Sequence, residues 1–170
     1  MVNEFFEITK YKSQKITLSK ETIDLYYMLV QLSDELSPVL APRGNTVTLH
    51  LDENLTIEAD PEKLARVFNN ILKNAASYSF PHTEILIFAE KLEHEVIIRF
   101  QNSGEDIPNE ALASLFNKFY RVDQSRSSDT GGTGLGLAIA KEIVTLHGGA
   151  ISTSSKNHVV TFTVSLPLSN

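Results

Sequence analysis

A glycine-dense turn near the carboxyl end of the chain opens directly into an apolar helical segment. The turn occupies residues 131–137 and reads GGTGLGL, and apolar residues then recur at three- and four-residue intervals up to a stop signal at residues 147–149. The free N–H groups and the positive dipole end at such a helix start suit an anion such as phosphate. A glycine turn that only packs closely against its surroundings is the alternative.

The residues before this turn exclude one common phosphate-binding context. A dinucleotide-binding fold places a buried strand directly before its glycines. Residues 121–130 read RVDQSRSSDT, which is polar and has no strand pattern. We therefore interpret this segment as a lid rich in serine, aspartate and arginine.

Two asparagines four residues apart form a second candidate site. Asp60 followed by Pro61 is typical of a helix start, and the apolar residues that follow predict a helix to about Tyr78. Asn70 and Asn74 would then lie on one face of that helix. Asparagines that face solvent or cap the helix are the alternative, and without further information they are the more common case.

The remaining elements follow from hydrophobic periodicity and turn residues. A helix is expected from an N-cap at Ser19 through Leu36, after a short strand at residues 14–18. Strands are expected at 46–51, 55–59, 83–91, 95–101, 150–155 and 159–166, with a short helix after Pro108. This order predicts an α+β fold, a two-layer α/β sandwich on a mixed, mostly antiparallel sheet with three main helices.

Composition limits the partners of this chain. Its 170 residues carry a formal net charge of -6, whereas nucleic-acid-binding domains usually present a basic stripe, so we expect no nucleic-acid partner. The length fits one domain that needs no disulfide, and the sequence has no cysteine. No apolar run approaches the roughly 20 residues of a membrane span.

Four segments in this order resemble the ATP-binding catalytic domain of sensor histidine kinases, a branch of the superfamily that also holds DNA gyrase, HSP90 and the MutL proteins. They read FNNILKNAASYS at 68–79, NSGEDIP at 102–108, LFNKFYR at 115–121 and GGTGLGL at 131–137. The resemblance implies a Bergerat-type ATP-binding fold over residues 13–170. Residues 1–12 would be the end of a dimerisation-domain helix.

The resemblance also implies ATP and Mg²⁺ as ligands. Asn74 matches the asparagine whose side-chain oxygen binds Mg²⁺ in that family, and Asn70 matches its partner one turn earlier. A hard cation prefers oxygen ligands, and Mg²⁺ usually keeps waters and phosphate oxygens beside one or two protein oxygens. The further implied nucleotide contacts are Ser77, Tyr78, Asn102, Gly104, Ile107, Gly132, Thr133, Gly134, Leu135 and Gly136.

The implied catalytic residues are Asn70, Arg121 and Arg126. The two arginines would contact the γ-phosphate, although solvated loop arginines are the alternative. ATPases of the superfamily have a glutamate base at the position of Asn70, and an amide cannot accept a proton in that way. The resemblance therefore favours transfer of the γ-phosphoryl group to a histidine of a domain outside this chain. A gyrase-type ATPase clamp and a nucleotide-impaired interaction module are the alternatives.

Two residues depart from the family pattern. Asn102 stands where the family has an aspartate that accepts a hydrogen bond from the adenine amino group, and Asp106 replaces a glycine. A neutral hydrogen bond is weaker than a charge-assisted one, which predicts a cost of about 1 kcal/mol. An asparagine amide, however, pairs with two adenine edge atoms at once when it reads DNA.

The resemblance finally implies the cellular setting. The partners would be the protein's own dimerisation domain, which carries the acceptor histidine, and the receiver domain of a response regulator. We expect this piece to be monomeric, the full-length protein to be a homodimer, and the domain to be the cytoplasmic part of a membrane-anchored sensor.

Overall fold

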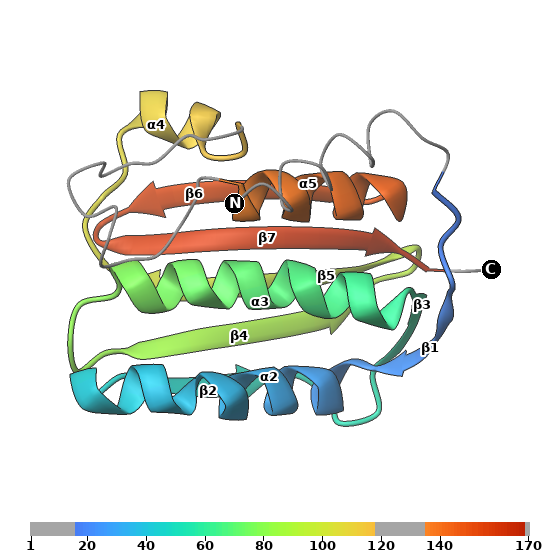
Figure 1. The fold of residues 1–170 in the computed structure, drawn as a ribbon, viewed down its shortest axis with the longest axis horizontal. Coiled ribbons are helices and arrows are strands. Elements are labelled where there is room, and N and C mark those ends of the chain that lie inside the picture. The colour runs from blue at the N-terminus through green and yellow to red at the C-terminus, as the bar shows by residue number, and fades with distance from the viewer. Residues whose placement is uncertain (1–15, 118–134, 169–170) are drawn as a thin grey trace.

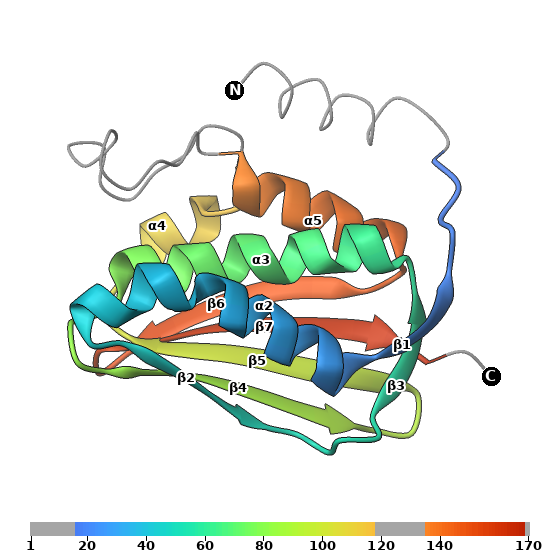
Figure 2. The ribbon, with the colours of Figure 1, turned by 60° about the horizontal axis from the view of Figure 1, so that its bottom comes forward.

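Three helices lie side by side across one face of a five-stranded β-sheet (Figure 1). The computed structural model describes residues 16–117 and 135–168. The helices are α2 (Leu25–Leu40), α3 (Pro61–Tyr78) and α5 (Gly136–Leu146). Figure 2 shows all three on the same side of the sheet. The predicted two-layer α+β sandwich with three main helices is confirmed.

The sheet has the strand order β2-β4-β5-β7-β6. The pairing of β2 with β4 is parallel, and the other three pairings are antiparallel. The strands are β2 (Thr46–His50), β4 (Glu84–Lys91), β5 (Glu95–Ser103), β6 (Ala150–Lys156) and β7 (Val159–Pro167). Both predicted hairpins, β4–β5 and β6–β7, are therefore confirmed.

Alternating burial along β5 shows which face of the sheet carries the core. Val96, Ile98 and Phe100 are buried, and the residues between them are only half-buried. Phe100 packs against Phe68 of α3 with the ring centres 5.5 Å apart. Because side chains alternate between the two faces of a strand, Asn102 lies on the same helix-covered face as these apolar residues.

Helix α3 begins and ends as the sequence predicts. The Asp60 carboxylate accepts a hydrogen bond from the Lys63 backbone N–H at 3.2 Å, and Pro61 occupies the first helical position. The buried residues of the helix recur at three- and four-residue spacing and comprise Leu64, Val67, Phe68, Ile71, Leu72, Ala75 and Ala76. This stripe fixes the helix against the sheet and leaves the other faces for polar residues.

The predicted start of the first helix is wrong. Residues 16–20 are not a strand, and α2 begins at Leu25 with Asp24 as its N-cap, whose carboxylate accepts from the Tyr27 backbone N–H at 3.0 Å. Residues before the cap form β1 (Glu21–Asp24), which pairs antiparallel with β3 (Thr56–Ala59). Tertiary pairing of Ile23 with Ile57 therefore overrides the local helical pattern.

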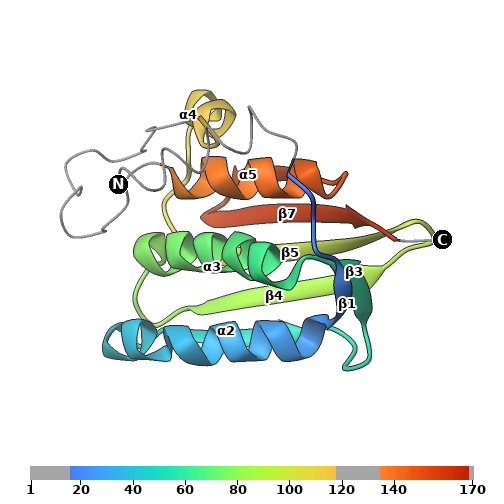
Figure 3. The same cartoon turned by 45° about the vertical axis from the view of Figure 1, so that its right-hand side comes forward.

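Helix α5 runs antiparallel to α3, as Figure 3 shows from the side. A short helix α4 (Asn109–Ser114) follows β5 and lies at the end of the sheet where α3 ends. A 3₁₀ turn η1 (Ala41–Arg43) links α2 to β2. In the residues that the structure describes, no helix has the length and apolar character needed to cross a membrane.

Candidate nucleotide site

Three chain segments from distant parts of the sequence meet at one end of the sheet, on the left in Figure 1: the end of α3, the end of β5 and the segment that leads into α4. A fourth segment, the start of α5, lies against the middle of α3. The predicted site residues that the structure describes come from these segments, so the fold brings them to one region.

Asn70 joins the middle of α3 to the start of α5. Its Nδ2 donates a hydrogen bond to the Gly136 carbonyl oxygen at 2.9 Å. A Cβ atom at Gly136 would lie 3.5 Å from the Asn70 Cγ, which is an ordinary van der Waals contact. The amide therefore orients the first residue of the helix whose amino terminus is expected to face phosphate.

The polar face of α3 continues toward its carboxyl end. Asn70, Asn74 and Tyr78 follow one another at four-residue spacing, and Ser77 lies beside them. All four side chains are half-buried, whereas Lys73 between them is exposed. This line of polar groups extends from the start of α5 to the end of β5.

Asn102 is buried at the end of β5. The residue is only 4% exposed, and its Nδ2 has no hydrogen-bond partner among the residues that the structure describes. Buried polar groups are nearly always paired with protein or bound water, so an unpaired one calls for an explanation. A bound ligand with an acceptor atom would supply the missing partner.

Gly104 borders Asn102 and allows the chain to approach closely. A Cβ atom at this position would lie 2.5 Å from the Tyr78 carbonyl oxygen and 3.2 Å from the Asn102 Nδ2. The Gly104 N–H donates to the His158 carbonyl oxygen at 3.0 Å, and Gly104 also forms a bridge with Ser79. Glycine is thus required here because β5 passes directly against the last turn of α3.

The segment after Gly104 is anchored to the β6–β7 hairpin. The Ile107 N–H donates to the Ser155 Oγ at 2.8 Å, and its side chain packs against the core. The Asp106 carboxylate accepts from the His158 backbone N–H at 2.7 Å. Asp106 therefore stabilises the turn that contains His158, where the backbone φ is 63°. This is a structural role that the sequence analysis did not foresee.

A polar clamp behind α3 was not predicted either. Arg43 donates from both terminal nitrogens, to the Ala76 carbonyl oxygen at 2.8 Å and to the Ser79 carbonyl oxygen at 2.7 Å. These are carbonyl groups that a helix end leaves without intrahelical partners, and a cation there also complements the helix dipole. Arg43 consequently fixes the part of α3 that carries Ser77 and Tyr78. In the sequence, the only sign of this role is that Arg43 directly precedes Gly44 in a turn.

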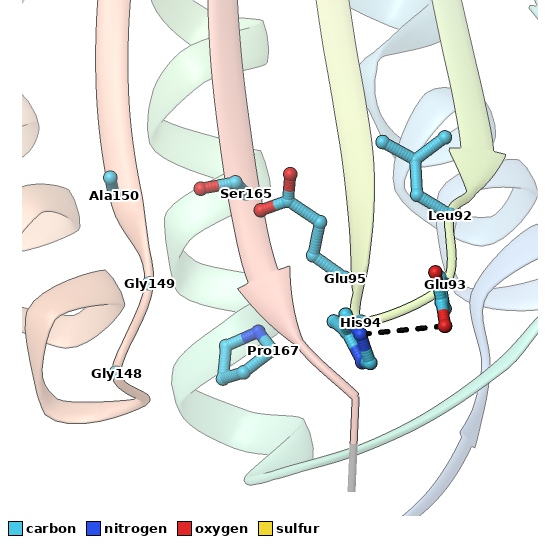
Figure 4. A pocket seen from close by; sticks show the side chains of 9 residues that line it. All are labelled: Leu92, Glu93, His94, Glu95, Gly148, Gly149, Ala150, Ser165 and Pro167. Carbon is cyan, nitrogen blue, oxygen red and sulfur yellow. Dashed lines mark ion pairs between the residues drawn. The ribbon is translucent and has the colours of Figure 1, made fainter.

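The other end of β5 carries a separate feature. A surface cavity of about 400 Å³ lies between the β4–β5 turn and the start of β6, and Figure 4 shows Glu93, His94 and Glu95 around it. His94 and Glu93 form an exposed pair at 3.6 Å. Because Glu95 begins β5 and Asn102 stands near its end, the cavity lies away from the candidate site.

Several predicted site residues lie outside the described part of the chain. They are Arg121, Arg126, Gly132, Thr133 and Gly134. Leu135 and Gly136 are described, and Leu135 is fully buried at the start of α5.

The residues present fit the ligands that were predicted. The unpaired Asn102 amide suits a base edge, and the start of α5 suits phosphate. Within residues 16–117 and 135–168, no group of three or more His, Cys, Asp or Glu side chains is placed to hold a metal ion. One protein oxygen, such as the amide oxygen of Asn74, is compatible with Mg²⁺ that is held mainly by phosphate and water.

Comparison with known proteins identifies the family of this chain. Residues 59–170 match the family described as histidine kinase-, DNA gyrase B-, and HSP90-like ATPase. The chain is 56% identical over 167 residues to the sensor protein VanS of Enterococcus faecium and 45% identical over 168 residues to the sensor protein VanSC of Enterococcus gallinarum. Both alignments cover 98% of this chain, which spans 43% and 46% of the length of these relatives.

A solved structure shows the same fold. The catalytic domain of the histidine kinase ThkA is 25% identical, with a TM-score of 0.79. The match covers 89% of this chain and 97% of that domain. On the family match and the agreement in fold, the chain belongs to the histidine kinase-, DNA gyrase B- and HSP90-like ATPase family.

Proposed function

We propose that this chain is the catalytic ATP-binding domain of a two-component sensor histidine kinase. It binds Mg²⁺–ATP and donates the γ-phosphoryl group to a histidine on a dimerisation domain. The observation that carries the proposal is the buried, unpaired Asn102 amide beside Gly104, at the same end of the fold as Asn70, Asn74 and the start of α5. Its similarity to sensor proteins over 98% of its length supports the same conclusion.

Each group of residues has one task in this proposal. Asn102, Gly104 and Tyr78 hold the base, with Ile107 beside them. Asn74 supplies an oxygen to Mg²⁺, and Ser77, Leu135 and Gly136 border the phosphates together with Gly132, Thr133 and Gly134. When bound, Mg²⁺ offsets the charge that phosphoryl transfer redistributes over the phosphate oxygens. The protein contributes position and electrostatic complementarity rather than a nucleophile of its own.

Asn70 favours transfer over hydrolysis. An asparagine has no basic group that removes a proton from water, and the Asn70 Nδ2 donates to the Gly136 carbonyl oxygen. Arg121 and Arg126 are proposed to offset charge on the γ-phosphate during transfer. The domain therefore binds the phosphoryl donor and leaves the attacking group to its partner.

The partners follow from the same proposal. The dimerisation domain of the full-length protein supplies the acceptor histidine, and a response-regulator receiver domain takes the phosphoryl group next. The similarity to VanS and VanSC supports a role in vancomycin-resistance signalling. The full-length protein would be a membrane-anchored homodimer with this domain in the cytoplasm.

A transfer assay tests the proposed function. The chain is mixed with a separately purified dimerisation domain and radiolabelled Mg²⁺–ATP, and acid-labile phosphate is measured on that domain. We expect labelling of the partner and no labelling of this chain alone. Steady-state ATP turnover near 1 s⁻¹, a rate in the ordinary enzyme range, would instead support the gyrase-type clamp. Absence of any heat with Mg²⁺–ATP in calorimetry would support an interaction module.

A further inference from the structure

The Asn102 amide differs from the other buried polar groups that lack a partner. In the described part of the chain, these atoms are Asn45 Oδ1, Asn102 Nδ2 and Thr153 Oγ1. The Asn45 amide is fixed, because its Nδ2 donates to the Phe80 carbonyl oxygen at 2.8 Å and to the Thr83 carbonyl oxygen at 3.1 Å. No such bond fixes the Nδ2 of Asn102.

No hydrogen bond from the Nδ2 to the described part of the chain fixes the orientation of the buried Asn102 amide. Gly104 adds no side chain beside the Nδ2, which a Cβ atom there would approach to 3.2 Å. The Gly104 N–H is already bonded to the His158 carbonyl oxygen, and the Tyr78 carbonyl oxygen would lie 2.5 Å from a Cβ atom at Gly104. An amide in this position can rotate by 180° and exchange its donor and its acceptor without breaking a bond from the Nδ2 to the protein.

This freedom matters for the choice of base. In one orientation the amide can accept from the 6-amino group of adenine and donate to N1; the pairing uses the same two amide atoms that asparagine places on N6 and N7 of adenine in DNA. In the other orientation it donates to the oxygen of a 6-oxopurine and accepts from its N1–H. A carboxylate has only acceptors, so at a fixed base position its oxygen repels the 6-oxo group.

We infer that this site takes 6-oxopurine nucleoside triphosphates as well as ATP, and that Asn102 is the residue that determines this breadth. The inference rests on the proposed function, since it places a nucleotide base at Asn102. The inference concerns only the edge of the purine base that carries the 6-substituent and N1.

Inosine triphosphate is the sharpest probe. It differs from ATP only at the edge that Asn102 would read, and it lacks the 2-amino group of guanine, through which a carboxylate could bind in a second way. Calorimetry of the full chain with Mg²⁺ gives the dissociation constants of both nucleotides. We expect the two constants to agree within about tenfold, which corresponds to 1.4 kcal/mol.

Asn102→Asp is the decisive variant. We expect it to tighten ATP binding, because a charge-assisted hydrogen bond to the 6-amino group replaces a neutral one, and to weaken inosine triphosphate binding. The dissociation constant of inosine triphosphate divided by that of ATP should therefore rise by at least about tenfold. Asn102→Leu removes the unpaired amide at similar volume, and both nucleotides should then weaken by a similar factor. Thr153→Val, which removes the other unpaired donor, is the matched control and should leave the ratio unchanged.

The outcomes separate this inference from the proposed function. If ATP binds and inosine triphosphate binds more than about tenfold more weakly, the inference is wrong and the proposed function stands. An unchanged ratio in a folded Asn102→Asp protein would remove Asn102 as the determinant. If neither nucleotide binds, both the inference and the proposed function fail.

Discussion

The two ends of helix α3 differ in how their polar groups are satisfied. At the amino end, Asp60 accepts from the backbone N–H groups of Ser19 and Lys63 at 3.0 and 3.2 Å, and its own N–H donates to the Nε2 of His147 at 3.1 Å. The Nδ1 of His147 in turn bonds the Ile143 carbonyl oxygen at 2.9 Å. The chain itself supplies each of these partners, so this end is closed.

The carboxyl end of α3 is open by comparison. Arg43 satisfies the helix carbonyl groups from behind, whereas the Nδ2 of Asn102 is buried with no partner among the described residues. Asn74 and Ser77 are half-buried on the face beside it. In the proposed function, the buried polar groups at the amino end serve folding, whereas the unpaired Asn102 amide at the carboxyl end serves the nucleotide.

The largest expected effect is on ligand binding at the open end. Asn74→Ala removes the proposed Mg²⁺ ligand, and we expect Mg²⁺-dependent ATP affinity to fall about 100-fold, since even outer partners of a bound metal contribute about 10–100-fold. Calorimetry with and without Mg²⁺ measures the change. Lys73→Ala on the exposed face of the same turn is the matched control. Equal losses in the two variants would contradict the metal assignment.

At the closed end, His147→Leu should affect stability alone. It leaves the Asp60 N–H and the Ile143 carbonyl oxygen buried without side-chain partners, at a cost of about 2 kcal/mol in the free energy of unfolding. Urea denaturation measures this cost, and ATP affinity under native conditions should stay within about twofold. A large loss of ATP affinity in the folded variant would show that the two ends are not separate.

Removing the cap of α3 should have a somewhat smaller effect. Asp60→Ala loses the N-cap, which predicts a loss of about 1–2 kcal/mol in the free energy of unfolding. Thermal unfolding at pH 7 measures this loss. Asp24→Ala, which removes the corresponding cap of α2, provides a comparison on a helix far from the site. No loss of stability in Asp60→Ala would mean that the closed end is not held by this carboxylate.

The same carboxylate predicts a pH dependence. Burial by itself would raise the pKa of Asp60, but the hydrogen bonds from Ser19 and Lys63 and the Lys63 ammonium outweigh it and hold this pKa below its usual range. A group whose pKa is lowered by folding stabilises the protein above its unfolded pKa, which is about 4. That contribution is lost as the pH falls from about 4 through the folded pKa, so Asp60→Asn should lose less stability than the wild type between pH 6 and pH 3.

The smallest effect is expected at the clamp. Arg43→Met leaves the Ala76 and Ser79 carbonyl oxygens to water, and we expect about 1 kcal/mol less stability. Because these carbonyls belong to the end of α3 that carries Tyr78, ATP affinity should fall slightly as well, by about threefold. Arg43→Lys keeps a cation, so it should retain more stability and more ATP affinity than Arg43→Met. A loss of stability with no change in affinity would limit Arg43 to folding.

Local signals in the sequence predicted much of this fold. Asp60 with Pro61 marked the start of α3, and alternation marked the two hairpins, because caps, turns and strand periodicity act over a few residues. The start of α2 was mispredicted, because Ile23 pairs with Ile57, 34 positions later in the sequence, and local propensity does not register such a pairing.

The site was predictable only in its residue types. Motif order identified Asn70, Asn74, Asn102 and Gly104 as a set, and the fold brings their segments to one end of the sheet. The contacts that distinguish the two ends of α3 could not be read from the chain. His147 and Asp60 lie 87 positions apart, and the missing partner of the Asn102 Nδ2 is a property of packing alone.

Hydrogen exchange measured with and without Mg²⁺–ATP tests the difference between the two ends most directly. We expect the nucleotide to slow backbone exchange in residues 70–78 and 102–107 and at the start of α5. We expect no change around Asp60, Lys63 and His147 at the closed end. Protection confined to the closed end, or no protection at either end under saturating nucleotide, would contradict the assignment of the nucleotide site.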